Sequence, residues 1–304
     1  MTLTPAHFDV LPLRGHALLD SGDAWKLERY GDCVLARPDP QALWRPRLAR
    51  DEWEAADLVF ERESDRGGTW RRGARARRDT PQQWTVEHEG ARFLCRPTPF
   101  KHVGLFPEQA VNWRWLTELA PRLKRGSESP KLLNLFGYTG AASVLATQAG
   151  YAVTHVDASR ASLGWARENA AASGLADDAW RVLLEDAPAF VAKERRRGAR
   201  YAAVLLDPPH YGRGPKGEKW QLEEQLAALV DNACALLEER AVLVLSTYAV
   251  GCSPLAFANL LSDHGGAGAV IEAGELVLAE EPRAGLAARL LPCGFCARLA
   301  RGLA

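Results

Sequence analysis

From residue 130 onward, short apolar runs alternate with segments of helical periodicity, and this alternation limits the chain to few folds. The apolar runs lie at Leu132–Phe136, Ala152–Val156, Trp180–Leu184, Ala202–Leu206, Ala241–Ser246, Val270–Leu278 and Gly294–Leu299. Helical patterns occur at Ala141–Ala149, Arg160–Ser173, Ala187–Arg196, Glu218–Leu237 and from Pro254. Such alternation is typical of a largely parallel sheet covered by helices on both faces. We therefore predict an α/β fold with a doubly wound sheet of seven strands.

The chain before residue 97 has a different texture, in which turn residues separate short runs and helical periodicity is weak. Two pairs of runs are spaced as β-hairpins. These pairs are Lys26–Tyr30 with Cys33–Ala36, and Trp84–His88 with Arg92–Cys95. We predict a small antiparallel β-rich domain at 1–96 and the α/β domain at 97–304, where an amphipathic stretch from Pro107 to Lys124 precedes the sheet.

One stretch, from Arg62 to Arg78, is strongly basic. Seven arginines stand there against two acidic residues, Glu63 and Asp65, with Trp70 among them. Arginines interleaved with an aromatic residue suit RNA, although a charge run is also typical of ordinary solvated surface. The formal net charge of the whole chain is zero, so global charge identifies no partner.

Composition excludes several classes of protein. The apolar runs are far shorter than the roughly 20 residues that span a bilayer, so we expect no membrane segment and a cytoplasmic protein. Six cysteines are widely spaced, unlike those of a dense disulfide scaffold. The close pair Cys293 and Cys296 could serve metal or redox chemistry, but a zinc site needs further ligands at suitable spacing. We expect two thiols buried in a strand and no metal.

Glycines and acidic residues follow the first three strands of the predicted sheet. Gly137 and Gly140 form a turn before a helix, where glycine lets a ligand approach the main chain. Asp157, after the second strand, can accept both ribose hydroxyls of an adenosine, and Asp186, after the third, can meet the adenine amine. Helix packing and helix capping are the structural alternatives. Because parallel strands end at one edge, we predict a nucleoside-type cofactor there.

A nicotinamide dinucleotide is the competing cofactor. Its fingerprint requires a third glycine against the helix, and Ser143 stands at that position. Binding of a dinucleotide would also leave unexplained the segment Asp207-Pro208-Pro209-His210-Tyr211 after the fourth strand.

In that segment, two prolines fix the backbone and remove two donors, so its carbonyls are expected to stay open at the crevice. Together with the Asp207 carboxylate they suit the hydrogens of an exocyclic amine, and Tyr211 can stack on an extruded base. A rigid loop without a ligand is the alternative. From Gly212 to Trp220 we expect a flexible basic loop, which either holds phosphate oxygens or is only solvated.

The motifs LNLFGYTGAAS, VDAS, LLEDA and LLDPPHYGRGPKGE resemble, in order and spacing, the S-adenosylmethionine (SAM)-dependent methyltransferase family that includes the bacterial large-subunit ribosomal RNA cytosine-C5 methyltransferases. The resemblance runs from about Phe100 to the end of the chain. It implies a Rossmann-like methyltransferase domain, SAM as cofactor and RNA as substrate, with ribosomal RNA favoured. By this resemblance the cofactor-binding residues are Gln109, Phe136, Gly137, Tyr138, Gly140, Asp157, Ala158, Asp186, Ala187 and Asp207. The acceptor residues are Asp207, Pro208, Pro209, His210 and Tyr211.

One departure concerns the expected nucleophile. The cytosine-C5 members carry a cysteine shortly after the fifth strand, whereas Ala249 stands at that position here. Cys252 is close by, just before the helix that begins at Pro254, and a helix N-terminus can lower a thiol pKa. The simpler interpretation is a small buried side chain. The departure puts carbon methylation in doubt but not methyl transfer.

Two other functions stay open on sequence alone. One is methylation of a small molecule or of a protein side chain, and the other is a SAM-binding or RNA-binding module without catalysis. His210 can act as a general base, but a positioning or structural role is the stronger expectation. The sequence leaves the target nucleotide, the modified atom and the oligomeric state open.

Overall fold

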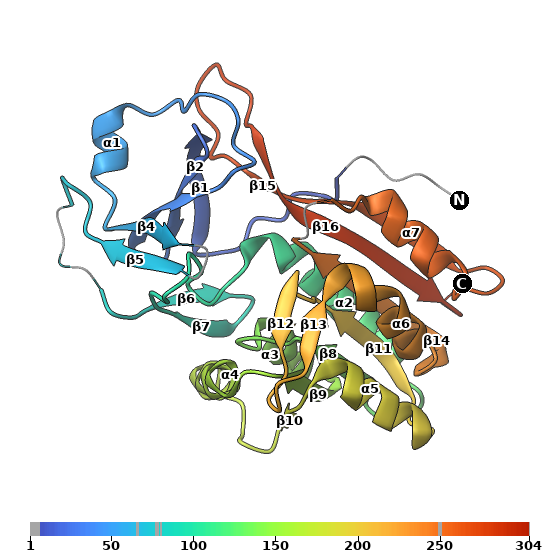
Figure 1. Cartoon of the computed structure of the whole chain (residues 1–304). Coiled ribbons are helices and arrows are strands. Elements are labelled where there is room, and N and C mark those ends of the chain that lie inside the picture. Colours follow the sequence, from blue (N-terminus) through green and yellow to red (C-terminus); the bar gives the residue numbers. More distant parts are fainter. Residues whose placement is uncertain (1–6, 65–66, 77–78, 80, 249–250, 304) are drawn as a thin grey trace. The chain divides into compact units, whose positions relative to one another are not determined.

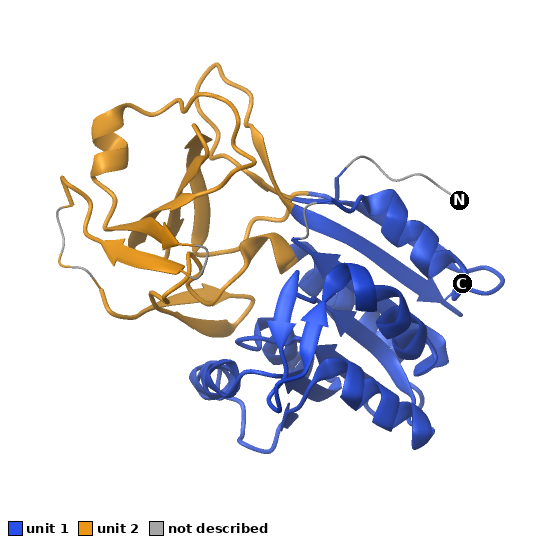
Figure 2. Ribbon diagram, in the orientation of Figure 1, with its two compact units in different colours: residues 1–9, 111–276, 294–304 blue, residues 10–110, 277–293 orange. Residues whose placement is uncertain are grey.

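The structure is a computed structural model that describes residues 7–64, 67–76, 79, 81–248 and 251–303 (Figure 1). The chain divides into two compact units, each built from separate segments (Figure 2). Unit 1 comprises 1–9, 111–276 and 294–304, and unit 2 comprises 10–110 and 277–293. The division into domains at 1–96 and 97–304 stays a prediction.

Unit 1 is built on a seven-stranded sheet in the order β10-β9-β8-β11-β14-β16-β15. The strands are β8 (Lys131–Leu135), β9 (Ala152–Asp157), β10 (Arg181–Leu184), β11 (Tyr201–Leu206), β14 (Leu237–Thr247), β15 (Val270–Ala279) and β16 (Leu290–Arg301). The first five strands of this order pair in parallel, and β16 runs antiparallel to β14. All seven predicted strands occur, which confirms the expected fold.

Different helices cover the two faces of this sheet. The helices are α2 (Ala110–Leu123), α3 (Ala141–Gln148), α4 (Arg160–Ala172), α5 (Ala187–Arg196), α6 (Leu222–Cys234) and α7 (Pro254–Ser262). Leu133 and Leu135 of β8 pack in a core with residues of α5, α6 and α7. Asn134, which points to the other face, bonds Ser143 of α3. Burial on both faces explains why the parallel strands are continuous apolar runs.

Unit 2 contains a five-stranded sheet in the order β1-β2-β3-β4-β5 and a separate hairpin, β6-β7. The strands are β1 (His16–Gly22), β2 (Trp25–Tyr30), β3 (Cys33–Pro38), β4 (Leu58–Ser64), β5 (Gly67–Arg71), β6 (Trp84–His88) and β7 (Ala91–Cys95). Both predicted hairpins are confirmed, as β2-β3 and β6-β7. The sheet is not wholly antiparallel, because β3 and β4 pair in parallel. The connection between them carries helix α1 (Arg50–Glu54), and such a crossover permits parallel pairing.

Within the described part of the chain, every helix is too short or too polar to cross a membrane.

Candidate active site

The candidate site lies at the carboxyl edge of the parallel strands in unit 1. Strands β8, β9, β10 and β11 end at this edge, and the predicted site residues follow them (Figure 1). Within the sheet, β9 lies beside β8 on one side, and β11 lies beside β8 on the other side. Open α/β sheets bind ligands at such a switch point.

The turn after β8 has an unusual backbone. Phe136 and Tyr138 adopt positive φ values of 56° and 50°, which bulky residues rarely adopt and which carry strain. A side chain at Gly137 would run into the His155 ring. At Gly140, where φ is 82°, an added Cβ would lie 2.9 Å from Trp180 and 3.0 Å from Ala166. Glycine is therefore required at both positions, and the strained turn brings main chain to the sheet edge.

Asp157 ties this turn to the loop after β9. Its Oδ2 accepts the Tyr138 N–H at 2.8 Å, and its Oδ1 accepts the Ser159 N–H at 2.8 Å. Burial raises the pKa of Asp157, against the opposing effect of these hydrogen bonds. Ser159, not Asp157, caps α4, so the capping interpretation of Asp157 is wrong. A carboxylate offers about four lone-pair sites, so Asp157 keeps acceptor capacity for a ligand hydroxyl.

Asp186 has the capping role that the sequence left open as an alternative. Its Oδ1 accepts the Ala189 N–H at 3.0 Å and caps α5, whose first residue is Ala187. Burial raises the pKa of Asp186, and the charges of Glu218 and Glu185 raise it further. Capping uses one oxygen, and the other remains for an amine donor.

A buried polar network beneath the turn escaped the sequence analysis. The Asn134 side-chain amide donates to Ser143 Oγ at 2.9 Å, and Ser143 Oγ lies 2.9 Å from His155 Nδ1. His155 is fully buried, its Nε2 has no partner among the described residues, and burial lowers its pKa to about 4. Polar residues inside apolar strand runs were the available signal. Ser143, which departs from the dinucleotide fingerprint, is the link of this network.

The acceptor segment follows β11, and its first residue, Asp207, is half-buried. The carbonyls expected to be open already accept bonds: Pro208 O from Thr247 Oγ1 at 3.2 Å, and Pro209 O from Trp220 Nε1 at 2.6 Å. The two prolines are therefore anchored as well as rigid. A carbonyl oxygen has two lone pairs, so these bonds leave room for a substrate donor.

His210 and Tyr211 form the exposed end of this segment. His210 Nε2 lies 2.5 Å from Glu223 Oε1, and hydrogen bonds from the Glu223 main chain and from His210 lower the pKa of Glu223. The Tyr211 ring lies edge-on to His210, with centroids 4.2 Å apart, and is 64% exposed. Glu223 was not predicted from sequence, because thirteen positions separate it from its partner.

Residues 212–220 are not the flexible loop that we expected. They belong to a hairpin of β12 (Tyr211–Arg213) and β13 (Lys219–Gln221). The Gly214 N–H donates to Glu218 O at 2.8 Å, and Gly217 adopts a φ of 91° that closes the turn. Trp220 is buried against Phe136, with ring centroids 5.3 Å apart. This hairpin also delays the start of α6 from the expected Glu218 to Leu222.

Ala249 lies outside the described residues, whereas Cys252 is described. Cys252 is half-buried and packs against the core of the sheet. Ser253 caps α7, and burial raises the pKa of the Cys252 thiol, with the charge of Glu223 adding to the effect. Burial thus opposes the lowering of this pKa that the sequence analysis considered for a helix N-terminus.

Cys293 and Cys296 both lie on β16 as free thiols, half-buried and buried respectively. Burial raises the pKa of Cys296 to about 12 and that of Cys293 still more strongly. Neither thiol has the low pKa of a redox-active cysteine.

Gln109 is the last residue of a short 3₁₀ helix, Pro107–Gln109, and its side chain is buried. It belongs to unit 2, whereas the strand-end residues belong to unit 1. Its contact with the cofactor stays a prediction.

No profile of a known protein family matches the chain. It is 30% identical over 222 residues to the ribosomal RNA large subunit methyltransferase K/L of Stutzerimonas stutzeri, covering 72% of this chain and 27% of that protein. It is 28% identical over 163 residues to the protein of that name from Shewanella frigidimarina, covering 53% of this chain and 22% of that one. The chain thus spans about a quarter of the length of these curated relatives.

A solved structure matches along nearly the whole chain. It is the SAM-dependent methyltransferase from Agrobacterium tumefaciens, 39% identical, with a TM-score of 0.86, covering 99% of this chain and 96% of that one. With the glycine turn, Asp157 and Asp186 at the ends of successive parallel strands, this similarity identifies the chain as a member of the SAM-dependent methyltransferase family.

Proposed function

We propose that the protein transfers the methyl group of SAM to a base in RNA, with ribosomal RNA as the favoured substrate. The observation that carries this proposal is the anchored segment from Asp207 to Tyr211, which has a carboxylate and an exposed aromatic ring after the carboxyl end of β11. The curated relatives, named as ribosomal RNA methyltransferases, support the choice of RNA.

The residues at the sheet edge fit SAM. The main chain of Phe136, Gly137, Tyr138 and Gly140 approaches the cofactor at the strained turn after β8. Packing against neighbouring residues of the protein requires the two glycines of this turn. Asp157 accepts the ribose hydroxyls through lone pairs that its backbone bonds leave, and Ala158 follows it in the same loop. Asp186 accepts the adenine amine beside Ala187. When bound, SAM supplies an electrophilic methyl group on sulfur.

The acceptor residues act mainly by positioning. The Asp207 carboxylate and the anchored proline carbonyls accept hydrogens of the base, which aligns its nucleophilic atom with the methyl group. His210, held by Glu223, bounds the site and positions the acceptor. Orientation of this kind supplies much of the rate in a displacement reaction.

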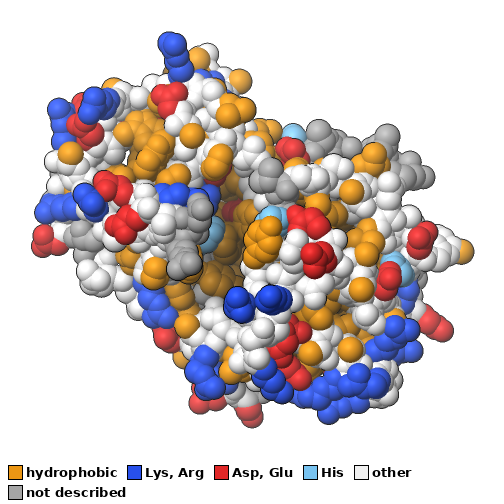
Figure 3. All heavy atoms as spheres, in the orientation of Figure 1, with side chains coloured by type: hydrophobic (Ala, Val, Ile, Leu, Met, Phe, Trp, Pro, Cys, Tyr) orange, Lys and Arg blue, Asp and Glu red, His pale blue; other side chains and the backbone are white. Residues whose placement is uncertain are grey.

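The arginine-rich stretch contributes less free positive charge than its sequence indicates. Arg71 pairs with Glu61 at 2.9 Å, and Arg75 with Glu54 at 3.2 Å. Arg66, Arg77 and Arg78 lie outside the described residues. On the face shown in Figure 3, blue Lys and Arg side chains are interspersed with red Asp and Glu side chains. The RNA assignment therefore rests on the acceptor segment rather than on a basic surface.

The test is methyl transfer to RNA from a strain that lacks the gene. The full chain is incubated with radiolabelled SAM and this RNA, and mass spectrometry locates the modified nucleotide. We expect incorporation at a site that is unmethylated in the deletion strain and methylated in its parent. SAM binding by calorimetry without methylation of any RNA would contradict the proposal. It would favour a small-molecule or protein substrate, or a non-catalytic module.

A further inference from the structure

The hairpin β12-β13 presents two different faces. In its register Tyr211 stands opposite Gln221, Gly212 opposite Trp220, and Arg213 opposite Lys219. Opposed residues share a face, and successive residues alternate between faces. Trp220 is buried against Phe136. The opposite face therefore carries the other two opposed pairs, which are polar or charged.

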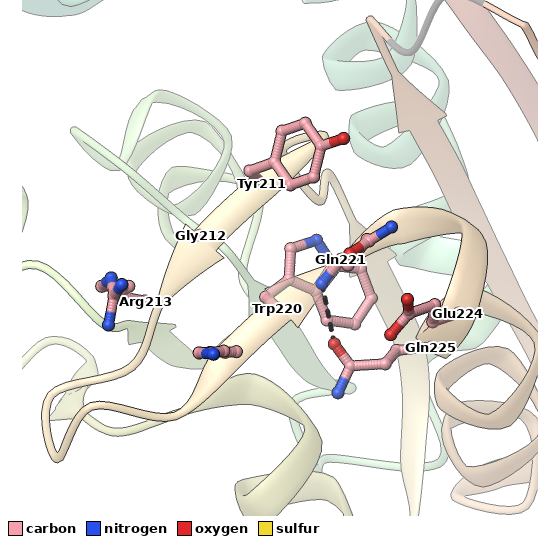
Figure 4. A pocket seen from close by; sticks show the side chains of 8 residues that line it. Tyr211, Gly212, Arg213, Trp220, Gln221, Glu224 and Gln225 are labelled. Atoms are coloured by element: carbon pink, nitrogen blue, oxygen red, sulfur yellow. Dashed lines mark hydrogen bonds between the residues drawn. The ribbon is translucent and has the colours of Figure 1, made fainter. Parts of the chain in front are cut away.

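Residues of this hairpin, with Glu224 and Gln225 of α6, line a pocket of about 600 Å³, a size typical of small-ligand sites. Figure 4 shows Arg213 at one end of the pocket, Tyr211 and Trp220 in the middle, and Gln221, Glu224 and Gln225 at the other end. The Gln221 N–H donates to Gln225 Oε1 at 2.8 Å, so the amide NH₂ of Gln225 remains as a donor. The pocket thus has a cationic end, an aromatic middle and an amide end.

The charges at the cationic end favour an anionic ligand. Arg213 and Lys219 are exposed and directly opposed across the hairpin, an arrangement that costs stability because like charges repel. Within the described part of the chain, neither forms an ion pair with an acidic side chain. Arginine and lysine are the usual partners of phosphate oxygens in nucleic acids. Glu224 lies at the other end of the pocket (Figure 4), so its negative charge does not neutralise the end that carries Arg213 and Lys219.

The aromatic middle suits a base. Tyr211 is 64% exposed, which is unusual for a large aromatic ring. The ring packs edge-on against His210, with ring centroids 4.2 Å apart. Exposed aromatic rings in RNA-binding proteins stack on unpaired bases. Tyr211 lines the pocket, whereas Asp207 does not. Its ring therefore suits a neighbour of the target base better than the extruded base considered in the sequence analysis.

We propose that this pocket binds one nucleotide of a single-stranded RNA segment, adjacent to the methylated base. Tyr211 stacks on its base, Arg213 and Lys219 hold its phosphate, and Gln221 and Gln225 contact the base edge. This inference rests on the proposed function and adds to it a sequence-reading subsite. Single-stranded RNA is the substrate form, because bases within a duplex are not available for stacking on a side chain.

The test compares two double variants that remove equal charge. Arg213→Ser with Lys219→Ser alters the pocket, whereas Arg196→Ser with Arg200→Ser alters exposed arginines at the opposite edge of the sheet. Binding and methylation of a single-stranded oligoribonucleotide that carries the target are measured at several salt concentrations. Loss of the contacts to this one phosphate should flatten the log–log salt slope by about 0.7. We expect the RNA KM of the pocket variant to rise about tenfold, with SAM affinity unchanged.

Tyr211→Ala and Tyr211→Phe complete the test. Loss of stacking should weaken RNA binding about tenfold in the alanine variant, whereas the phenylalanine variant keeps wild-type affinity. An unchanged KM and salt slope in the pocket variant, or an equal change in the control, would refute the subsite while methylation by the wild type upholds the proposed function. A wild type that methylates no RNA would refute both.

Discussion

The two halves of the sheet edge are held in different ways. In the cofactor half, Asp157 and Asp186 accept main-chain N–H groups, and they are half-buried and buried respectively. In the acceptor half, side chains do this work: Thr247 and Trp220 anchor the proline carbonyls. In the cofactor half, substitution of a donor residue leaves its main-chain N–H in place. In the acceptor half, substitution of Thr247 or Trp220 removes the donor itself. The anchoring of the cofactor half therefore depends on the two aspartates, whereas the proline carbonyls of the acceptor half depend on side chains from β13 and β14.

The largest expected effect tests the acceptor half. Asp207→Ala should lower kcat by about a hundredfold or more, since a misplaced acceptor loses its alignment with the methyl group. The affinity for SAM should change far less than kcat. Radiolabel transfer and calorimetry on the same preparation measure both quantities. A parallel loss of SAM affinity would assign Asp207 to the cofactor half and erase the division.

The second prediction concerns the buried network under the cofactor turn. The pKa of His155 is about 4 in the folded protein and near 6.5 in an unfolded chain. Between these values the unfolded chain binds the proton first, so the free energy of unfolding falls as pH falls. The full loss from this group is about 3 kcal/mol, reached below pH 4.

In His155→Gln this contribution disappears. Urea denaturation from pH 7 to pH 4 should show a shallower decline than in the wild type, while His16 and His102, whose pKa values burial also lowers, contribute equally to both curves. Parallel curves would mean that His155 carries no such penalty and that the network does not set the pH limit of the fold.

A third, smaller effect is expected at the ribose position. Asp157→Ala removes a charged acceptor from the cofactor, a loss of roughly 1.5–3 kcal/mol or about tenfold or more in affinity for SAM and S-adenosylhomocysteine. Asp178→Ala, an exposed aspartate in the loop before β10, is the matched control. Calorimetry that finds equal affinities in the two folded variants would remove Asp157 from the cofactor half.

The sequence predicted the parts of the molecule that depend on local pattern. Strands buried on both faces are recognisable as apolar runs, and glycine or aspartate at their ends is recognisable as a motif. The Asn134–Ser143–His155 network depends on contacts between separate elements, so no local pattern reports it. The hairpin at 211–221 was mistaken for a loop because its stability comes from the burial of Trp220. The parallel pairing of β3 and β4 also depends on tertiary context.

The smallest expected effect is at Cys252, and it decides which chemistry the acceptor half performs. Carbon-5 of cytosine reacts only after a thiolate adds to the neighbouring carbon, whereas an amine or ring nitrogen needs no such help. Burial and the charge of Glu223 raise the pKa of Cys252, which disfavours the thiolate, and its side chain packs against the core. We expect Cys252→Ala to keep methyl transfer within about threefold, equivalent to less than about 1 kcal/mol. Loss of transfer with SAM binding intact, or a covalent adduct trapped with 5-fluorocytosine RNA, would establish cysteine-dependent carbon methylation. A residue of the acceptor half would then form a covalent bond to the base during the reaction, in addition to the positioning of the base.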